Sequence, residues 1–196
     1  YLCKDTILMG LSNLLFVTLR RVKYTWLSSA KRVVGSPIKH QPLLLNGLGE
    51  LKFGRANHFG VIRSPHYYTG YSYIEAREVT ASVTIGHNFN ANNNLSIVAE
   101  HASISIGDNV VCGYNVQIYD SNFHDLHSTN RMENKGTSSS VKIENNVFIG
   151  NNVVILKGVI IGENAVIGSN AVVTKNVPSN VIVAGNPAVQ VNTVKV

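Results

Sequence analysis

Hydrophobic positions recur every six residues along the second half of the chain. From Ile143 to Pro178 each group of six opens with Ile or Val, often continues with Gly, and places a small or β-branched residue fifth. A short strand alternates its side chains in and out, so apolar residues at positions one and five require a corner before the next group. Gly and Asn tolerate a positive φ at such corners. The clearest groups are Ile149-Gly-Asn-Asn-Val-Val, Ile161-Gly-Glu-Asn-Ala-Val and Ile167-Gly-Ser-Asn-Ala-Val.

This pattern predicts a parallel β-helix. Three short strands and three corners make a triangular coil of about 18 residues, and coils stack at about 4.8 Å. The register returns at Ile106, with an earlier run from Ile85, and it slips by three residues before Ile106. It slips by one across a long polar loop at 119–142. A β-sandwich has no reason to keep strict sixes, so we predict an all-β fold of hexapeptide repeats whose two exposed ends need caps.

The beginning of the chain has a different pattern. Residues 7–19 are apolar but shorter than the roughly 20 residues that span a bilayer, and they lack a signal-peptide cleavage site. We predict an N-terminal helical, basic segment over 1–40 and a β-helix domain over 41–196. The helix is expected to cap the first coil or pack on a neighbouring subunit. The alternative is that residues 7–32 lie in a membrane interface, with the basic end toward anionic lipid.

Composition and charge narrow the class of protein. Charged residues make up only 14% of the chain against 44% hydrophobic residues, which excludes a disordered chain or a coiled coil. The net charge of +6 comes from a basic cluster in the first forty residues, without the interleaved aromatics of a nucleic-acid-binding face. Cys3 and Cys112 cannot form a disulfide framework. We therefore expect a cytoplasmic protein, peripheral at the inner face of the membrane under the alternative above, and no nucleic-acid partner.

Three stretches resemble a known family. They are Phe89-Asn-Ala-Asn-Asn-Asn-Leu-Ser-Ile-Val-Ala-Glu100, the segment Ile118-Tyr-Asp-Ser-Asn-Phe-His124, and the repeats from Val147 through Ala184-Gly-Asn-Pro-Ala188. Together they resemble the hexapeptide-repeat acyltransferases, in the branch of galactoside, maltose and xenobiotic acetyltransferases and O-antigen and capsule O-acetyltransferases. The resemblance implies a left-handed prism, an exception to the usual right-handed crossover. It also implies acetyl-CoA as co-substrate.

Acyl transfer from a thioester to a hydroxyl or amine needs a base, a polarised carbonyl and alignment. Histidine is the natural base near neutral pH, and of the seven histidines His124 lies in the long loop. By resemblance the catalytic histidine of the family sits in this loop, which assigns His124 as general base and leaves His127 as the rival. Asp120 and Asp125 are both candidates to fix the tautomer of its ring, and Asp120 is carried as a catalytic candidate.

The resemblance also implies binding residues for both substrates. Asn92 matches an asparagine that reaches the acceptor from the adjacent subunit, and Glu100 falls where related enzymes carry an acidic substrate contact. Four further residues match positions along acetyl-CoA. Asn151 and Ser169 match positions that line the pantetheine arm, whereas Thr174 and Lys175 match positions near the nucleotide.

Two departures from the family pattern lie on the acetyl-CoA side. Val189 and Asn192 stand where related enzymes have basic residues, and Phe148 stands where they usually have Trp. A cation such as Lys175 still has a physical reason to meet a phosphate.

The leading functional hypothesis is an acetyl-CoA-dependent O-acetyltransferase that modifies a sugar hydroxyl in bacterial surface polysaccharide assembly. We expect a homotrimer, a sugar or polysaccharide-precursor acceptor, and no metal. One alternative is an N-acetyltransferase on an amino sugar or other small amine. The other is a non-catalytic β-helix scaffold or a protein like the γ-carbonic anhydrases, which needs three zinc-binding histidines.

Overall fold

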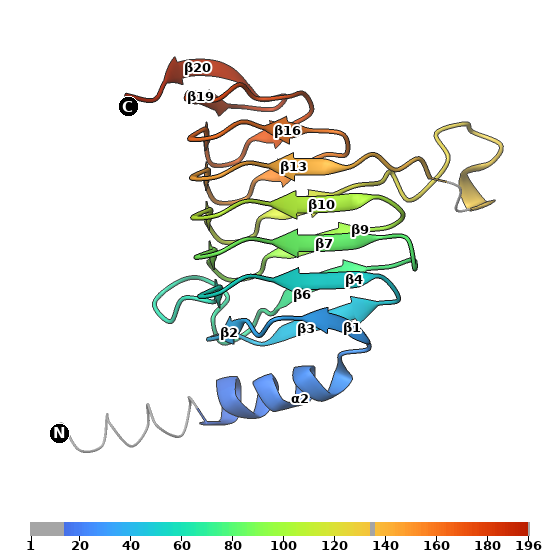
Figure 1. The fold of residues 1–196 in the computed structure, drawn as a ribbon, viewed down its shortest axis with the longest axis vertical. Coiled ribbons are helices and arrows are strands. Elements are labelled where there is room, and N and C mark those ends of the chain that lie inside the picture. Colours follow the sequence, from blue (N-terminus) through green and yellow to red (C-terminus); the bar gives the residue numbers. More distant parts are fainter. Residues whose placement is uncertain (1–13, 134–135, 196) are drawn as a thin grey trace.

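The chain forms a stack of triangular coils with three sheets along its sides. The computed structural model describes residues 14–133 and 136–195. Figure 1 shows strands stacked from α2 at one end of the molecule to β19 and β20 at the other. This is the predicted left-handed parallel β-helix. Residues 1–13, which include Cys3 and the first part of the predicted N-terminal segment, lie outside the described residues.

Each coil contributes one strand to each of three sheets. The first sheet contains β1 (Arg32–Val34), β4 (Glu50–Phe53), β7 (Ser82–Ile85), β10 (Ser103–Ile106), β13 (Val141–Ile143) and β16 (Ile160–Ile161). The second contains β2 (Ile38–Lys39), β5 (His58–Phe59), β8 (Asn90–Ala91), β11 (Val111–Cys112), β14 (Phe148–Ile149), β17 (Val166–Ile167), β19 (Val181–Ala184) and β20 (Val189–Thr193). The third contains β3 (Leu43–Gly47), β6 (Ser72–Ala76), β9 (Ser96–Ala99), β12 (Gln117–Tyr119), β15 (Val154–Ile155) and β18 (Val172–Val173).

The core is a set of apolar columns inside the prism. One column runs up the first sheet, where in-register residues of successive strands are all buried. Its members are Ile85, Ile106, Ile143 and Ile161. Because every inward position meets the same position of the next coil, the six-residue pattern translates directly into packing.

Asparagines at the corners take the left-handed backbone conformation that the pattern predicted. Asn115, Asn152 and Asn170 have φ values of 59°, 55° and 63°. Their side chains also form a ladder between coils, with Nδ2 of Asn115 donating to Oδ1 of Asn152 at 3.0 Å and Nδ2 of Asn152 donating to Oδ1 of Asn170 at 3.1 Å. The corner residue therefore fixes both the turn within a coil and the contact to the next coil.

Both predicted register slips are confirmed. Ile85 pairs with Ile106, three positions more than one regular coil, and Ile106 pairs with Ile143, one position more than two coils. The second slip accommodates the loop between β12 and β13, which contains the short 3₁₀ helix η2 (Arg131–Glu133). A further loop at 60–71, between β5 and β6, was not predicted.

The N-terminal end of the stack is covered by helix. A π-helical turn, η1 (Leu14–Thr18), leads into α2 (Leu19–Leu27), which lies across the first coil (Figure 1). The coil stack begins with β1, inside the segment that the sequence assigned to residues 1–40. At the other end β20 pairs antiparallel with β19. Among the described residues no helix has the length and apolarity that crossing a membrane requires.

Candidate active site

Two edges of the prism carry the residues singled out by the sequence. We call the corner where the chain enters the third sheet the entry edge, and the corner where it leaves that sheet the exit edge. The entry edge follows β8, β11, β14 and β17, and the exit edge follows β6, β9, β12, β15 and β18. Because coils stack in register, residues far apart in sequence line up along each edge.

The long loop at the exit edge carries His124 on the surface of the prism. Its Nδ1 lies 2.9 Å from the carbonyl oxygen of Arg131, in the same loop. A carbonyl oxygen only accepts hydrogen bonds, so Nδ1 carries the proton and Nε2 keeps a lone pair. The exposed ring lines a small pocket of about 160 Å³ together with Asn122, Asp125, Leu126 and Thr137. This geometry suits a general base.

Asp120 occupies a different place from the one expected. Its carboxylate is fully buried and accepts hydrogen bonds from three backbone N–H groups, those of Glu100 at 2.7 Å, His101 at 3.3 Å and Ala102 at 2.8 Å. These groups form the corner after β9, where the next coil departs into the loop and offers them no backbone partner. The role foreseen for Asp120, fixing the tautomer of His124, belongs to the carbonyl of Arg131 in this structure.

The other two loop candidates bond to their own neighbours. Asp125 accepts a hydrogen bond from the backbone N–H of His127 at 2.8 Å. The Nδ1 of His127 lies 2.8 Å from the hydroxyl of Thr129. Neither side chain has a hydrogen bond to the ring of His124 in the described part of the loop.

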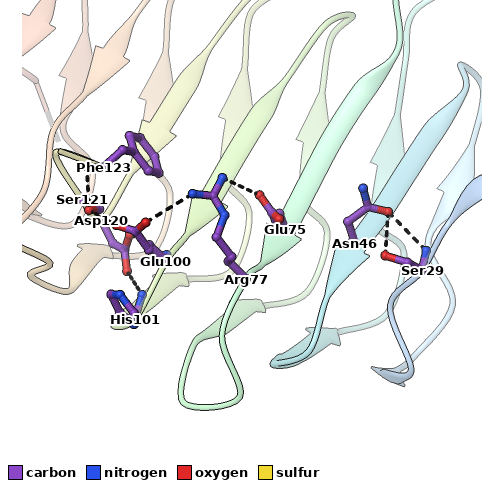
Figure 2. Close-up of polar contacts among 9 residues, drawn as sticks. All are labelled: Ser29, Asn46, Glu75, Arg77, Glu100, His101, Asp120, Ser121 and Phe123. Carbon is purple, nitrogen blue, oxygen red and sulfur yellow. Dashed lines mark hydrogen bonds and ion pairs between the residues drawn. The ribbon is translucent and has the colours of Figure 1, made fainter. Parts of the chain in front are cut away.

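A row of polar side chains crosses neighbouring coils at the third sheet and ends beneath the loop that carries His124 (Figure 2). Arg77, which follows β6, bonds to Glu75 at 3.0 Å and to Glu100 at 3.3 Å. Glu100 is 6% exposed, and its second carboxylate oxygen accepts a hydrogen bond from the hydroxyl of Ser121. The hydrogen bond to Glu75 is the main reason that the pKa of Arg77 is raised above its usual value. Both carboxylates therefore have partners, and the predicted substrate contact Glu100 is one part of a connected row.

Phe123 joins this row to His124. Its ring lies 5.1 Å from the guanidinium carbon of Arg77, and its backbone N–H donates to Ser121 Oγ at 2.9 Å. Phe123 has a φ of +61°, a conformation that bulky residues rarely adopt unless the surroundings hold it. Gly136 packs so closely that an added Cβ would lie 2.7 Å from the backbone nitrogen of Phe123. The backbone just before His124 is thus fixed by Ser121 and by Gly136.

Two asparagines on the entry edge make different contacts. Asn92 is half-buried and accepts a hydrogen bond from the N–H of Asn93 at 2.7 Å. Asn93 is fully buried, and its amide bonds to the N–H of Val61 at 2.9 Å and to the carbonyl of Pro65 at 2.8 Å. Asn93 therefore ties the 60–71 loop to the coils, while Asn92 lies at the corner itself.

The four residues expected to bind acetyl-CoA fall on two different edges. Asn151 and Ser169 follow β14 and β17 on the entry edge, where the N–H of Asn151 donates to Ser169 Oγ at 3.1 Å. Thr174 and Lys175 follow β18 on the exit edge and are exposed. Within one chain the structure brings each pair together but does not bring the two pairs to one edge.

Sequence analysis missed Arg77, Ser121 and Phe123. Their alignment could not be read from a six-residue repeat, because both coils involved carry extra residues. Ala76 pairs with Ala99, and Val98 pairs with Tyr119, which places Arg77, Glu100 and Ser121 in line just beyond the strand ends. A usable signal was the charged residue directly after each of β6, β9 and β12, which are Arg77, Glu100 and Asp120.

Two further observations concern the reactivity of a cysteine and the binding of metal ions. Burial raises the pKa of the Cys112 thiol to about 12, so this thiol stays protonated and is a poor nucleophile. In the described part of the chain, no group of three or more His, Cys, Asp or Glu side chains is placed to hold a metal ion.

The repeats match a known family. Residues 140–175 match the family model described as bacterial transferase hexapeptide, six repeats. No curated protein sequence matches the chain.

Among solved structures, the chain is similar to a maltose O-acetyltransferase from Clostridium difficile 630, with 28% identity and a TM-score of 0.54 over 86% of this chain and 70% of that chain. It is similar to a galactoside acetyltransferase in complex with coenzyme A, with 33% identity and a TM-score of 0.55 over 73% of this chain and 64% of that chain. A hexapeptide-repeat-containing acetyltransferase from Vibrio cholerae is 25% identical, with a TM-score of 0.51 over 91% of this chain and 79% of that chain. With the matched repeats and the shared coil architecture, these similarities show that the chain belongs to the hexapeptide-repeat acyltransferases.

Proposed function

We propose that the protein is an acetyl-CoA-dependent O-acetyltransferase that modifies a sugar hydroxyl in bacterial surface polysaccharide assembly. The observation that carries the proposal is the tautomer of His124, because its bond to the Arg131 carbonyl leaves Nε2 free to accept a proton. The maltose and galactoside acetyltransferases among the similar structures support a sugar acceptor, and the coenzyme A complex supports the donor.

In this mechanism His124 is the only group that moves a proton. Its Nε2 accepts the proton of the acceptor hydroxyl while the oxygen attacks the acetyl carbonyl of the donor. The C–O bond of the ester forms, the C–S bond of the thioester breaks, and the imidazolium returns the proton to the departing thiolate. The Arg131 carbonyl stabilises the protonated ring and fixes its orientation.

The acceptor site is proposed to include Asn92 and the row beneath the catalytic loop. Both carboxylate oxygens of Glu100 are engaged by Arg77 and Ser121, so Glu100 acts by holding Arg77 in place. The side chain of Arg77 is 39% exposed and keeps donors that can meet acceptor oxygens. Asp120 supports the same corner from inside the prism.

The donor site is proposed to use Asn151, Ser169, Thr174 and Lys175. The entry-edge pair is held close together, because Gly150 has no Cβ, and an added one would lie 2.6 Å from the Ser169 nitrogen. Lys175 is an exposed cation on the exit edge and suits a phosphate. Phe148, where related enzymes carry Trp, is 48% exposed and remains available to the adenine.

A homotrimer would bring the two edges together. The base, Glu100 and Lys175 lie on the exit edge, whereas Asn92 and Ser169 lie on the entry edge. In a closed threefold ring the exit edge of one subunit meets the entry edge of the next, which completes three equivalent sites. The third sheet, bounded by these two edges, then faces the threefold axis.

A pair of matched substitutions tests this trimer. Ser96 and Ser105 are both half-buried, outward-facing strand residues, one on the third sheet and one on the first. Ser96→Arg should dissociate the trimer in light scattering and abolish transfer, whereas Ser105→Arg should leave both unchanged. A wild-type protein that is monomeric and fully active would contradict the shared site.

The chemistry is tested by incubating the protein and acetyl-CoA with free, nucleotide-linked and lipid-linked sugars and identifying the products by mass. We expect one sugar class to gain an O-acetyl ester that mild base removes. An acetyl group that resists mild base, on an amino sugar, would favour N-acetyl transfer. Failure to bind acetyl-CoA at all would overturn the proposal and favour a scaffold.

The location proposed for this enzyme is the cytoplasm, at the inner face of the membrane, where a lipid-linked acceptor would be presented. The support is the distribution of charge, because the basic residues gather at the α2 end of the prism.

A further inference from the structure

Helix α2 has two opposite faces with different partners. Val17, Arg20 and Tyr24 point toward the coils. Val17 is 1% exposed, and Arg20 donates to the carbonyls of Thr69 at 2.9 Å and Gly70 at 3.0 Å. The ring of Tyr24 lies 4.6 Å from that of Tyr71, in the 60–71 loop, at an interplanar angle of 35°. These contacts attach the helix firmly to the end of the prism.

The opposite face is an apolar stripe that nothing in the described chain covers. Leu15, Leu19, Val22 and Trp26 follow one another at intervals of four, three and four residues, which places them on one side of the helix. They are 50%, 52%, 64% and 83% exposed. The stripe therefore lies on the side of the helix opposite Val17, Arg20 and Tyr24.

A groove beside the stripe combines apolar walls with two cations. It encloses about 510 Å³ between the helix and β2, and it is lined by Thr18, Arg21, Val22, Thr25, Trp26 and Lys39. Burial, with the nearby charge of Arg21, lowers the pKa of Lys39 below its usual value. An anion placed between these two cations would relieve their repulsion.

The segment that forms the groove and its surroundings carries no negatively charged side chain. Residues 14–49 contain no Asp or Glu, while Lys23 and Lys31 add further exposed cations. Within residues 14–133 and 136–195, no salt bridge engages Arg21, Lys23 or Lys39. The complementary partner is therefore a surface that is apolar inside and anionic outside.

We propose that the outer face of α2 is a docking surface for an anionic phospholipid membrane, with a headgroup phosphate bound between Arg21 and Lys39. Leu19, Val22 and Trp26 enter the boundary between headgroups and acyl chains, as in other interfacial amphipathic helices. This rests on the proposed membrane location but not on acetyl transfer. In the proposed trimer, three such faces lie at one end and bind together, which strengthens attachment without new contacts.

Cosedimentation with vesicles tests the proposal. The full chain should bind vesicles of phosphatidylglycerol mixed with phosphatidylcholine at low salt, and bind weakly to phosphatidylcholine alone. Binding should fall at high salt, where the screening length shortens to about 3 Å at 1 M. No binding to the anionic vesicles at low salt would overturn the proposal.

Matched variants separate the surface from general effects. Val22→Asp should weaken vesicle binding at least about tenfold, whereas Val191→Asp, at a valine of similar exposure on β20, should not. Each cation contributes about fivefold, so Arg21→Glu should weaken binding by more than that factor, with Lys195→Glu at the opposite end as control. Equal effects of the paired variants would overturn the assignment of this face.

Two further readings distinguish other occupants and the function itself. If the stripe packs against a second copy, Val22→Asp will change the oligomeric state in light scattering and the wild type will not bind vesicles, which contradicts the proposal. Acetyl transfer to a water-soluble sugar should be unchanged in Val22→Asp, so failure of membrane docking and failure of the enzymatic proposal give different results.

Discussion

The coils from β13 to β18 and the exit edge around β6, β9 and β12 are built from the same repeat but obey it to different degrees. In the first region every strand has two or three residues and pairs at a constant spacing, with an apolar column inside. In the second, coils carry extra residues, and polar groups take the positions just beyond the strands. The regular coils provide the rigid frame, and the irregular coils carry the polar residues of the candidate site.

Residues with a positive φ occur in both regions, but different interactions stabilise them. In the regular coils a positive φ falls on asparagines, which tolerate it and bond to the next coil. At the exit edge a positive φ falls on Phe123, directly before His124, the proposed base. There the conformation is held by Arg77, Ser121 and Gly136 rather than by residue preference. At Phe123 the packing of its neighbours therefore holds a backbone conformation that the residue itself disfavours.

The largest contrast is expected from removing the base. His124→Ala should lower turnover by about 10² to 10⁴, the usual contribution of a general base, while acetyl-CoA binding and stability stay unchanged. Steady-state kinetics and calorimetry measure these effects. His127→Ala is the control and should change turnover far less, and a reversal of the two effects would assign the base to His127.

A cavity in the regular coils should affect stability and not chemistry. Ile155 is fully buried in the third sheet, and Ile155→Ala should reduce the free energy of unfolding by about 2–5 kcal/mol. Leu156→Ala, at the next, partly exposed position, should cost much less. Denaturant unfolding at fixed protein concentration measures both, and equal losses would mean that the column is not the source of stability.

Breaking the polar row should affect catalysis rather than stability. Arg77→Met removes the partner of Glu75 and Glu100 and the contact with Phe123, so the catalytic loop should shift and kcat fall about 10- to 100-fold. Acetyl-CoA affinity should hardly change. Arg63→Met, at an exposed arginine of the 60–71 loop, serves as control. Full activity of Arg77→Met would remove the row from the mechanism.

The corner ladder should show a smaller, conformational effect. Asn152→Ala forces an alanine into the left-handed region and should cost about 1–2 kcal/mol of stability. Asn152→Gly accepts the same φ and should cost less, although it also loses both side-chain bonds. Equal losses for the two variants would show that the hydrogen bonds, which both variants lack, and not the backbone conformation, dominate.

The smallest expected effect is a pH dependence in the first coils. Nε2 of His40 lies 3.0 Å from Nδ1 of His58, and burial, then the charges of His58 and Arg21, lowers the pKa of His40 in the folded state. The unfolded chain therefore binds the proton more readily, so stability should be complete above about pH 6.5 and decline as the pH falls below it. His40→Gln should flatten this slope in unfolding measurements, and an unchanged slope would contradict the assignment.

Sequence analysis predicted the regions that follow the repeat and was weaker where the repeat fails. The coils, the handedness, the slip before Ile106 and the long loop are confirmed, because each follows from a local pattern of apolar residues, Gly and Asn or from the family resemblance. The roles of His124, Asn92 and Lys175 stay predictions. Asp120 was expected beside the base, but the corner N–H groups needed an acceptor inside the prism. No local sequence pattern could reveal this requirement, since it arises where the backbone of the next coil departs into the long loop and leaves the corner N–H groups without a backbone acceptor.

The number of stacked coils also sets the distances between positions along the prism axis. In the third sheet the single strand β15 lies between β12, which leads to the loop of His124, and β18, which leads to Lys175. The ends of β12 and β18 are therefore two coil steps apart, about 10 Å along the prism axis. Inserting or deleting one complete coil would change this span by about 4.8 Å and leave both edges aligned. In the proposed mechanism the distance between the base and the cation that meets the donor phosphate is therefore set in whole steps, by the number of coils between them.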